Sequence, residues 1–132
     1  MKDFKQLQVW QKAHSLSLAI YRATINFPKE EIYRLTSQLR RSVSSISANI
    51  AEGCGRGSDA DFGRFLFIAM GSACESECHL LLARDLTFLN QTKHAEMETA
   101  LVEVKRILAA LIGKVSVPRN NLRSQKEHQA DC

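Results

Sequence analysis

Hydrophobic residues recur every three or four positions along most of the chain, a spacing that lines one face of an α-helix. The first such stripe predicts a helix from about Leu7 to Asn26, which Pro28 ends because proline lacks a backbone donor. Its members are Val9, Ala13, Leu16, Ile20, Ala23 and Phe27. Pro28 and the two glutamates that follow it also favour the start of a second helix at once.

The second helix is expected to end at the glycine cluster from Gly53 to Gly57. Its stripe consists of Ile32, Leu35, Leu39, Val43, Ile46 and Ile50. Ser58, with Asp61 three residues later, is typical of an N-cap and predicts a third helix that ends near Leu89. The stripe of the third helix consists of Phe62, Phe65, Leu66, Ala69, Ala73, Leu80 and Leu81.

A fourth helix is expected after Thr92, its predicted N-cap, with Met97, Leu101, Val104, Leu108, Leu111 and Val115 on its apolar face. Four amphipathic helices with short connections predict an all-α fold, an antiparallel up-down-up-down four-helix bundle. We expect the bundle to occupy residues 1–117. Residues 118–132 are polar and without periodicity, and we expect them to form a disordered tail.

The third helix is apolar on nearly all sides from Phe65 to Met70, including Phe67. The next residues, Gly71, Ser72 and Ala73, are small enough for another backbone to approach closely. An apolar surface of this kind normally marks an interface, so the pattern predicts a homo-oligomer. The alternative is a monomer in which the third helix is simply central.

Composition narrows the class of protein without naming a function. The 132 residues are 45% hydrophobic and 24% charged, with two prolines and six glycines, as in a soluble domain with long helices. The uninterrupted apolar runs are much shorter than a membrane-spanning helix requires, and the N-terminus lacks a secretory pattern. We therefore expect a cytoplasmic protein with no membrane partner and with reduced cysteines.

The net charge of +4 is unevenly distributed, because residues 1–64 hold ten Lys and Arg against six Asp and Glu. On the second helix a polar stripe (Arg34, Gln38, Arg41, Ser45, Asn49 and Glu52) runs beside the apolar one. It is either an ordinary solvated face or a site built from Arg40, Arg41, Asn49, Glu52 and Arg56. Trp10 beside Lys12 and Tyr21 beside Arg22 could bind nucleic acid, or could pack at the edge of the bundle.

Catalytic and metal-binding patterns are weak. Glu75, Cys78 and His79 are the best candidates, but the sequence contains no Glu-x-x-His pair of the di-iron type. Cys74 and Cys78 lack the usual zinc-ligand spacing, and the glycine cluster follows a helix without a Gly-Lys-Ser/Thr sequence. We therefore expect no enzymatic activity, no metal and no cofactor.

Several stretches resemble the four-helix-bundle family of 23S rRNA intervening-sequence proteins, also labelled S23 ribosomal proteins. They are residues 7–13 (LQVWQKA), 27–33 (FPKEEIY), 38–41 (QLRR), 45–53 (SISANIAEG), Arg56, 65–72 (FLFIAMGS) and Glu75, within a resemblance that covers about residues 3–115. The resemblance implies a left-handed bundle that forms a ring-like homopentamer without enzymatic activity. It also implies a relationship to the accessory proteins of diversity-generating retroelements, which are basic and bind nucleic acid.

Two functions follow as expectations. In the first, an oligomeric, pentameric binding protein contacts structured RNA or DNA through Arg40, Arg41, Arg56, Lys12 and Arg22. The family stretches and the subunit contacts would then involve Asn49, Glu52, Gly53, Phe65, Phe67, Gly71, Ser72 and Glu75. In the second, the arginines pair with Glu52 and Glu75, and the protein is a structural scaffold or protein–protein interaction module with no nucleic-acid role.

Overall fold

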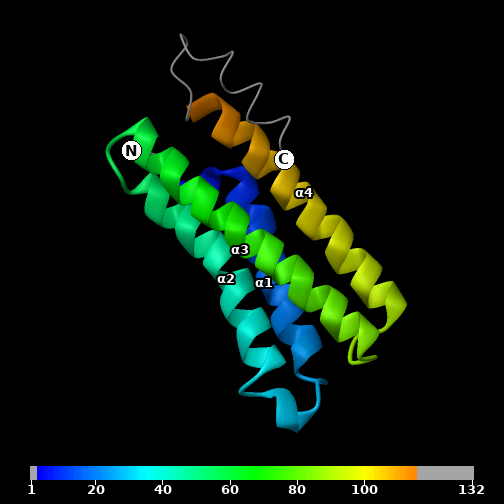
Figure 1. Ribbon diagram of the computed structural model, residues 1–132. Helices are drawn as coiled ribbons and strands as arrows, with labels where there is room; N and C mark the ends of the chain where they lie inside the picture. The colour runs from blue at the N-terminus through cyan, green and yellow to red at the C-terminus, as the bar shows by residue number, and fades with distance from the viewer. Residues whose placement is uncertain (1–2, 116–132) are drawn as a thin grey trace.

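The computed structural model describes residues 3–115, which form an elongated bundle of four helices that run alternately up and down (Figure 1). The helices are α1 (Gln8–Thr24), α2 (Leu35–Cys54), α3 (Asp59–Asp85) and α4 (Gln91–Val115), and short 3-10 helices, η1 (Phe4–Gln6) and η2 (Lys29–Glu31), precede α1 and α2. The predicted four-helix fold is confirmed. The tail expected at residues 118–132 lies outside the described residues.

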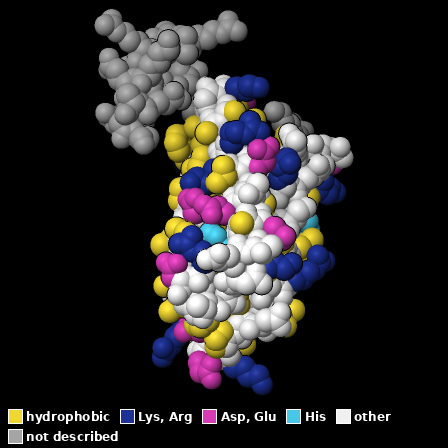
Figure 2. Space-filling model, turned by 90° about the vertical axis from the view of Figure 1, so that its right-hand side faces the viewer, with side chains coloured by type: hydrophobic (Ala, Val, Ile, Leu, Met, Phe, Trp, Pro, Cys, Tyr) yellow, Lys and Arg dark blue, Asp and Glu magenta, His cyan; other side chains and the backbone are white. Residues whose placement is uncertain are grey.

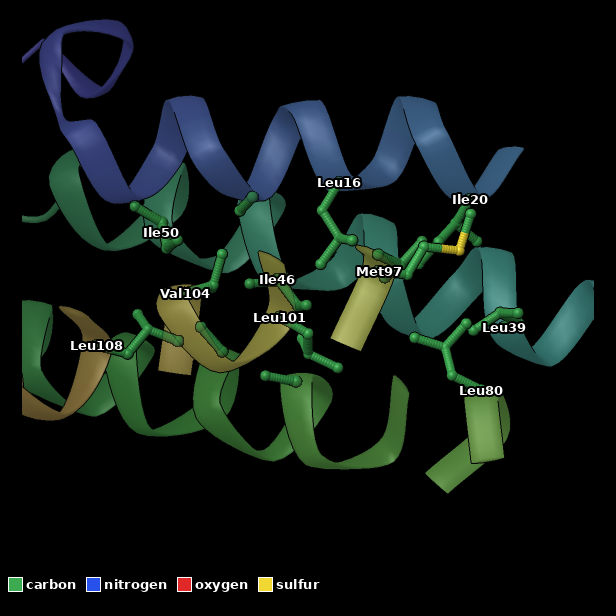
Figure 3. Packing of buried hydrophobic residues seen from close by; sticks show 14 of the residues in the cluster. Leu16, Ile20, Leu39, Ile46, Ile50, Leu80, Met97, Leu101, Val104 and Leu108 are labelled. Atoms are coloured by element: carbon green, nitrogen blue, oxygen red, sulfur yellow. The ribbon is translucent and has the colours of Figure 1, made fainter. Parts of the chain in front are cut away.

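The apolar stripes meet in one core along the axis of the bundle. Figure 3 shows side chains from the four helices pointing into this shared interior: Leu16, Ile20, Leu39, Ile46, Ile50, Leu80, Met97, Leu101, Val104 and Leu108. Full burial of such a side chain stabilises a fold by about 1.5–3 kcal/mol. The core therefore rests mainly on the positions that the three- and four-residue spacing predicts.

The start of the second helix differs from the prediction. After Pro28 the chain forms η2 and a turn, Arg34 leaves the helical region, and α2 begins only at Leu35. The Glu31 carboxylate accepts a hydrogen bond from the Leu35 backbone N–H at 3.2 Å. Ile32 is 51% exposed and does not belong to the buried stripe, because this turn, not a continuous helix, reverses the chain.

The boundaries of α3 are partly as predicted. The Ser58 hydroxyl accepts a hydrogen bond from the Asp61 N–H at 3.2 Å, which confirms the N-cap. The C-terminus comes at Asp85, earlier than Leu89, because Thr87 adopts a left-handed conformation with φ of 63°. The Phe88 N–H then bonds the Ala83 carbonyl and closes the last turn, an ending usually marked by a glycine, which this sequence lacks.

The N-cap predicted for α4 is wrong by two positions. The Asn90 side chain accepts a hydrogen bond from the Lys93 N–H at 2.8 Å, whereas Thr92 lies inside the helix. Asn and Thr are both suitable N-cap residues, so the position at which the preceding turn ends decides which of them caps the helix.

Among the described residues, α3 is the one helix long and apolar enough to cross a membrane, although its uninterrupted apolar runs are short. Nine of its residues lie in the protein interior. The remainder of its surface is also rich in hydrophobic side chains, with Phe67, Ile68, Leu81 and Leu82 exposed. In the single chain α3 is thus apolar on both its inner and its outer side.

Candidate interaction surface on α2 and α3

Polar side chains of α2 and α3 line the boundary between these two helices. We name this surface the α2–α3 polar strip: Arg41, Ser45, Asn49 and Glu52 from α2, Arg56 from the turn that follows α2, and Glu75 and His79 from α3. The α2 members follow one another by three or four residues, so successive turns of the helix bring them to the same side. The strip contains much of the sequence that resembles the family.

Glu75 joins the two helices at one end of the strip. Its Oε2 atom lies 3.2 Å from Nη2 of Arg41 and 3.1 Å from Nε2 of His79. Arg41 is mostly exposed and His79 largely covered, so solvent screens the Arg41 side of this cluster. An exposed ion pair of this kind contributes at most about 1 kcal/mol to the stability of the fold. The positive charge of Arg41 is nevertheless already paired with a carboxylate.

The other end of the strip is also internally paired. Arg56 Nη2 lies 3.0 Å from Glu52 Oε1, one helical turn apart. The guanidinium groups of Arg56 and Arg64 lie 4.9 and 4.7 Å from the centre of the Phe65 ring. Phe65, predicted as a contact residue, is therefore buried under two arginines.

The polar side chains in the middle of the strip form local hydrogen bonds. Asn49 Nδ2 donates to the Ser45 carbonyl at 2.8 Å and to the Ser45 hydroxyl at 3.0 Å. Beneath the strip, the buried hydroxyls of Ser42 and Ser76 are 2.9 Å apart and link α2 to α3. The two arginines and two glutamates of the strip balance in charge, so the strip is not an electropositive surface.

Gly53 allows α2 and α3 to approach closely. A Cβ atom at this position would lie 2.9 Å from the Phe65 Cβ and 3.0 Å from Cδ1 of Phe62. Gly53 lies within α2, which continues to Cys54 and ends inside the glycine cluster, as predicted. Its role in the single chain is packing between helices.

The basic residues proposed for nucleic acid do not form one patch. Arg40 leans toward α1, where its Nε donates to the Thr24 hydroxyl at 2.8 Å and its guanidinium covers the Tyr21 ring at 5.0 Å. Arg41 leans the opposite way, toward α3. Lys12 lines a groove between α1 and α4, and Arg22 is exposed on α1. Figure 2 shows basic and acidic side chains interspersed on one face.

One ion pair was not predicted, because it depends on the relative height of α3 and α4. Lys105 Nζ of α4 lies 2.8 Å from Glu77 Oε1 of α3, with both side chains mostly covered. The hydrogen bond to the Glu77 carboxylate raises the pKa of Lys105, and burial opposes it. This pair fixes the packing of α4 against α3.

The outer side of α3 exposes several large apolar side chains. Phe67 is 56% exposed, and Ile68, Leu81 and Leu82 are also exposed. Gly71 lies between them, and a Cβ placed there would meet nothing within 4 Å. Cys74 and Cys78 are exposed thiols on this helix. Among residues 3–115, no three His, Cys, Asp or Glu side chains gather as a metal site would require.

A solved structure supports the fold. The crystal structure, at 1.70 Å resolution, of a protein with unknown function from the S23 ribosomal protein family of Bacteroides thetaiotaomicron matches with a TM-score of 0.71 and 27% identity. The match covers 79% of this chain and 97% of the other. No protein with a curated description matches.

The sequence match extends over most of the helical bundle. The model of the 23S rRNA-intervening sequence protein family aligns with residues 5–110, from η1 into the last turns of α4. This range includes the α2–α3 polar strip and the outer side of α3. The predicted resemblance is thereby confirmed, and the chain belongs to the 23S rRNA-intervening sequence protein family.

Proposed function

We propose that this protein is a non-enzymatic, cytoplasmic building block that works as a homo-oligomer. The observation that carries the proposal is the exposed outer side of α3, where Phe67 and Leu82 lie in solvent on either side of Gly71. Large exposed apolar patches on soluble domains normally mark interfaces. The family resemblance supports a ring of five copies.

A protein partner fits this surface better than lipid. Glu75 and Glu77 lie in the middle of α3, and Glu77 is held by Lys105 of α4. Charges at the centre of a membrane-spanning helix are costly. Insertion would also remove from the bundle the nine interior residues of α3.

The paired charges favour a scaffold over a catalyst. Glu75 and Glu52, the acidic groups of the α2–α3 polar strip, each bind an arginine. A scaffold was expected to pair arginines with these two glutamates, and Arg41 and Arg56 are the arginines that do so. Both carboxylates thus hold arginines in place.

Light scattering coupled to size-exclusion chromatography tests this proposal. We expect the wild-type protein to elute with several times the mass of one chain. Phe67→Glu should lower that mass to one chain, with helical content unchanged by circular dichroism, because a charge cannot be buried unpaired at an apolar contact. Val102→Glu, at an exposed apolar position on α4, is the matched control and should keep the oligomer. A monomeric wild-type protein at tens of micromolar would refute the proposal.

A second candidate function, binding to RNA or DNA, is favoured by the turn between α1 and α2. Tyr33 is 91% exposed there and lies in sequence between Lys29 and Arg34, which form no ion pair within residues 3–115. An exposed ring among unpaired cations can stack on a base while the cations contact phosphates. Repetition of this turn in an oligomer would multiply its affinity for a polyanion.

A further inference from the structure

A pocket lies at the turn between α1 and α2, at the lower end of the bundle in Figure 1. Residues from the last turn of α1, from the turn itself and from the first half of α2 line it. Its volume of about 290 Å³ corresponds to about ten water molecules in the liquid. An organic molecule of about ten non-hydrogen atoms would therefore fill it.

The charged side chains on the walls of this pocket are all positive. Lys29 and Arg40 line it, and no carboxylate does. Neither cation forms an ion pair within residues 3–115. The Glu31 carboxylate accepts a hydrogen bond from the Leu35 N–H and does not line the pocket. The groove between α1 and α4 differs, because two glutamates line it together with Lys12. The pocket at the turn is thus suited to an anion.

Arg40 is held in place with part of its guanidinium group unused. Its Nε donates to the Thr24 hydroxyl at 2.8 Å, and its Nη2 donates to the Tyr21 carbonyl at 3.3 Å. The guanidinium group also covers the Tyr21 ring at 5.0 Å. These partners are all uncharged, and the remaining N–H groups can donate to a ligand. A guanidinium fixed in this way suits a carboxylate, whose two oxygens accept a pair of N–H bonds.

Thr36 adds a buried hydroxyl that has no partner. The residue is 4% exposed and lines the pocket, and its hydroxyl forms no hydrogen bond within the described part of the chain. Buried hydroxyl groups are normally paired, and an unpaired one lowers the stability of the fold. A ligand that carries an acceptor would supply the missing partner.

The rest of the pocket is largely apolar. Ile25 and Ile32 line it and are 73% and 51% exposed. Phe27, also in the lining, is buried and packs on Phe88 of the turn between α3 and α4, with ring centres 5.8 Å apart. This contact fixes one wall of the pocket. A ligand with an apolar body would remove the two exposed isoleucines from water, which favours binding.

We infer that this pocket binds a small organic carboxylate with an apolar body. The carboxylate accepts hydrogen bonds from Arg40 and Thr36, and Lys29 adds electrostatic attraction. The apolar body covers Ile25 and Ile32. A nucleic-acid phosphate carries the charge but lacks a compact apolar group, so it matches the lining less well. No residue of α3 lines the pocket, and the inference is therefore independent of the proposed oligomer.

Isoleucine-methyl NMR of the full-length protein, titrated with hexanoate, tests the inference. Hexanoate should shift the methyl signals of Ile25 and Ile32 and leave that of Ile68, exposed on α3, unchanged relative to a sodium chloride blank. Acetate and inorganic phosphate should bind at least about tenfold more weakly, because they lack the apolar body. Hexylammonium should not bind, because its charge is positive. Equal affinity for acetate and hexanoate, or equal binding of hexylammonium, would overturn the inference.

Variants distinguish a ligand site from a purely structural role. Thr36→Val should raise the melting temperature of the free protein, because it removes the unpaired hydroxyl, and should weaken hexanoate binding about fivefold. Arg40→Gln should weaken it about tenfold or more, whereas Arg22→Gln, at an exposed cation of α1 outside the pocket, is the matched control and should not. Ile32→Ser, at an exposed position that the fold does not need, should weaken binding of hexanoate but not of acetate.

The remaining outcomes also decide the matter. Absence of methyl shifts at high hexanoate concentration would overturn the inference and leave the homo-oligomer untouched. Shifts that Thr36→Val and Arg40→Gln leave unaltered would place hexanoate elsewhere and overturn it as well. Structured RNA that displaces hexanoate, and that loses affinity in Arg40→Gln, would assign the pocket to a nucleic-acid phosphate instead.

Discussion

Two adjacent arginines show how a residue's neighbours in space decide its role. Arg40 packs on Tyr21 and bonds Thr24 of α1, while Arg41 reaches Glu75 of α3. Consecutive helical positions differ by about 100° in direction, so two basic residues in sequence need not form one basic site. The sequence predicted a single arginine surface from their proximity, and the structure divides it between two helix pairs.

Gly53 provides a test of packing at the scale of one residue. Gly53→Ala should lower the free energy of unfolding by about 1–3 kcal/mol, because the new methyl group would clash with the Cβ of Phe65, which cannot move without its helix. Gly113→Ala is the control, since a Cβ there meets nothing within 4 Å. It should be neutral or stabilising by up to about 1 kcal/mol. Urea unfolding measures both, and equal effects would contradict the packing role.

At the scale of helices, periodicity predicts the interior far better than it predicts the ends. Leu39, Ile46 and Leu101 are completely buried, as their spacing indicates. The ends depend on chain geometry that a stripe does not encode: α3 stops at a left-handed Thr87, and α4 is capped by Asn90. Local sequence permits several caps, and tertiary packing selects one.

For the same reason, some of the ion pairs could be predicted from the sequence and others could not. The scaffold hypothesis predicted that arginines pair with Glu52 and Glu75, and the structure places Arg56 on Glu52 and Arg41 on Glu75. The pairing of Lys105 with Glu77 needs the relative height of α3 and α4, which the sequence alone does not provide.

The Lys105–Glu77 pair predicts a stability change at alkaline pH. Its hydrogen bond raises the pKa of Lys105 above the ordinary 10.5, so the folded chain holds this proton more tightly than the unfolded chain. The stabilisation is complete below about pH 10.5 and is lost as pH rises through the folded pKa. Glu77→Gln should therefore lower the free energy of unfolding by at most about 1 kcal/mol at pH 8, and by less above about pH 11.

Chemical denaturation at several pH values would measure this difference. Glu103→Gln is the control, because Glu103 pairs with Arg106 on the exposed side of α4 and an arginine does not titrate in this range. A Glu77→Gln cost that stays constant up to about pH 11.5 would show that the pair does not stabilise the fold through the Lys105 charge.

At the scale of the whole molecule, assembly would strengthen the attraction of a modestly basic chain for a polyanion. A net charge of +4 is weak on one chain, but five copies would carry about +20 and present each turn between α1 and α2 five times. The cations of this turn, Lys29 and Arg34, are unpaired within residues 3–115, whereas Arg41 and Arg56 are each bound to a glutamate. Polyanion binding should follow the unpaired cations.

Two double variants test that expectation. Lys29→Ala with Arg34→Ala should weaken binding to structured RNA and lower the salt slope of the binding constant by about 1 for each phosphate that the variant no longer binds. Arg41→Ala with Arg56→Ala removes the same charge but should change binding less, because a phosphate would have to displace Glu75 or Glu52 from these arginines. Fluorescence anisotropy across a salt titration measures both, with light scattering to show that the oligomer is intact. Equal weakening by the two variants would mean that net charge alone governs binding, and no binding at low salt would leave the scaffold as the function.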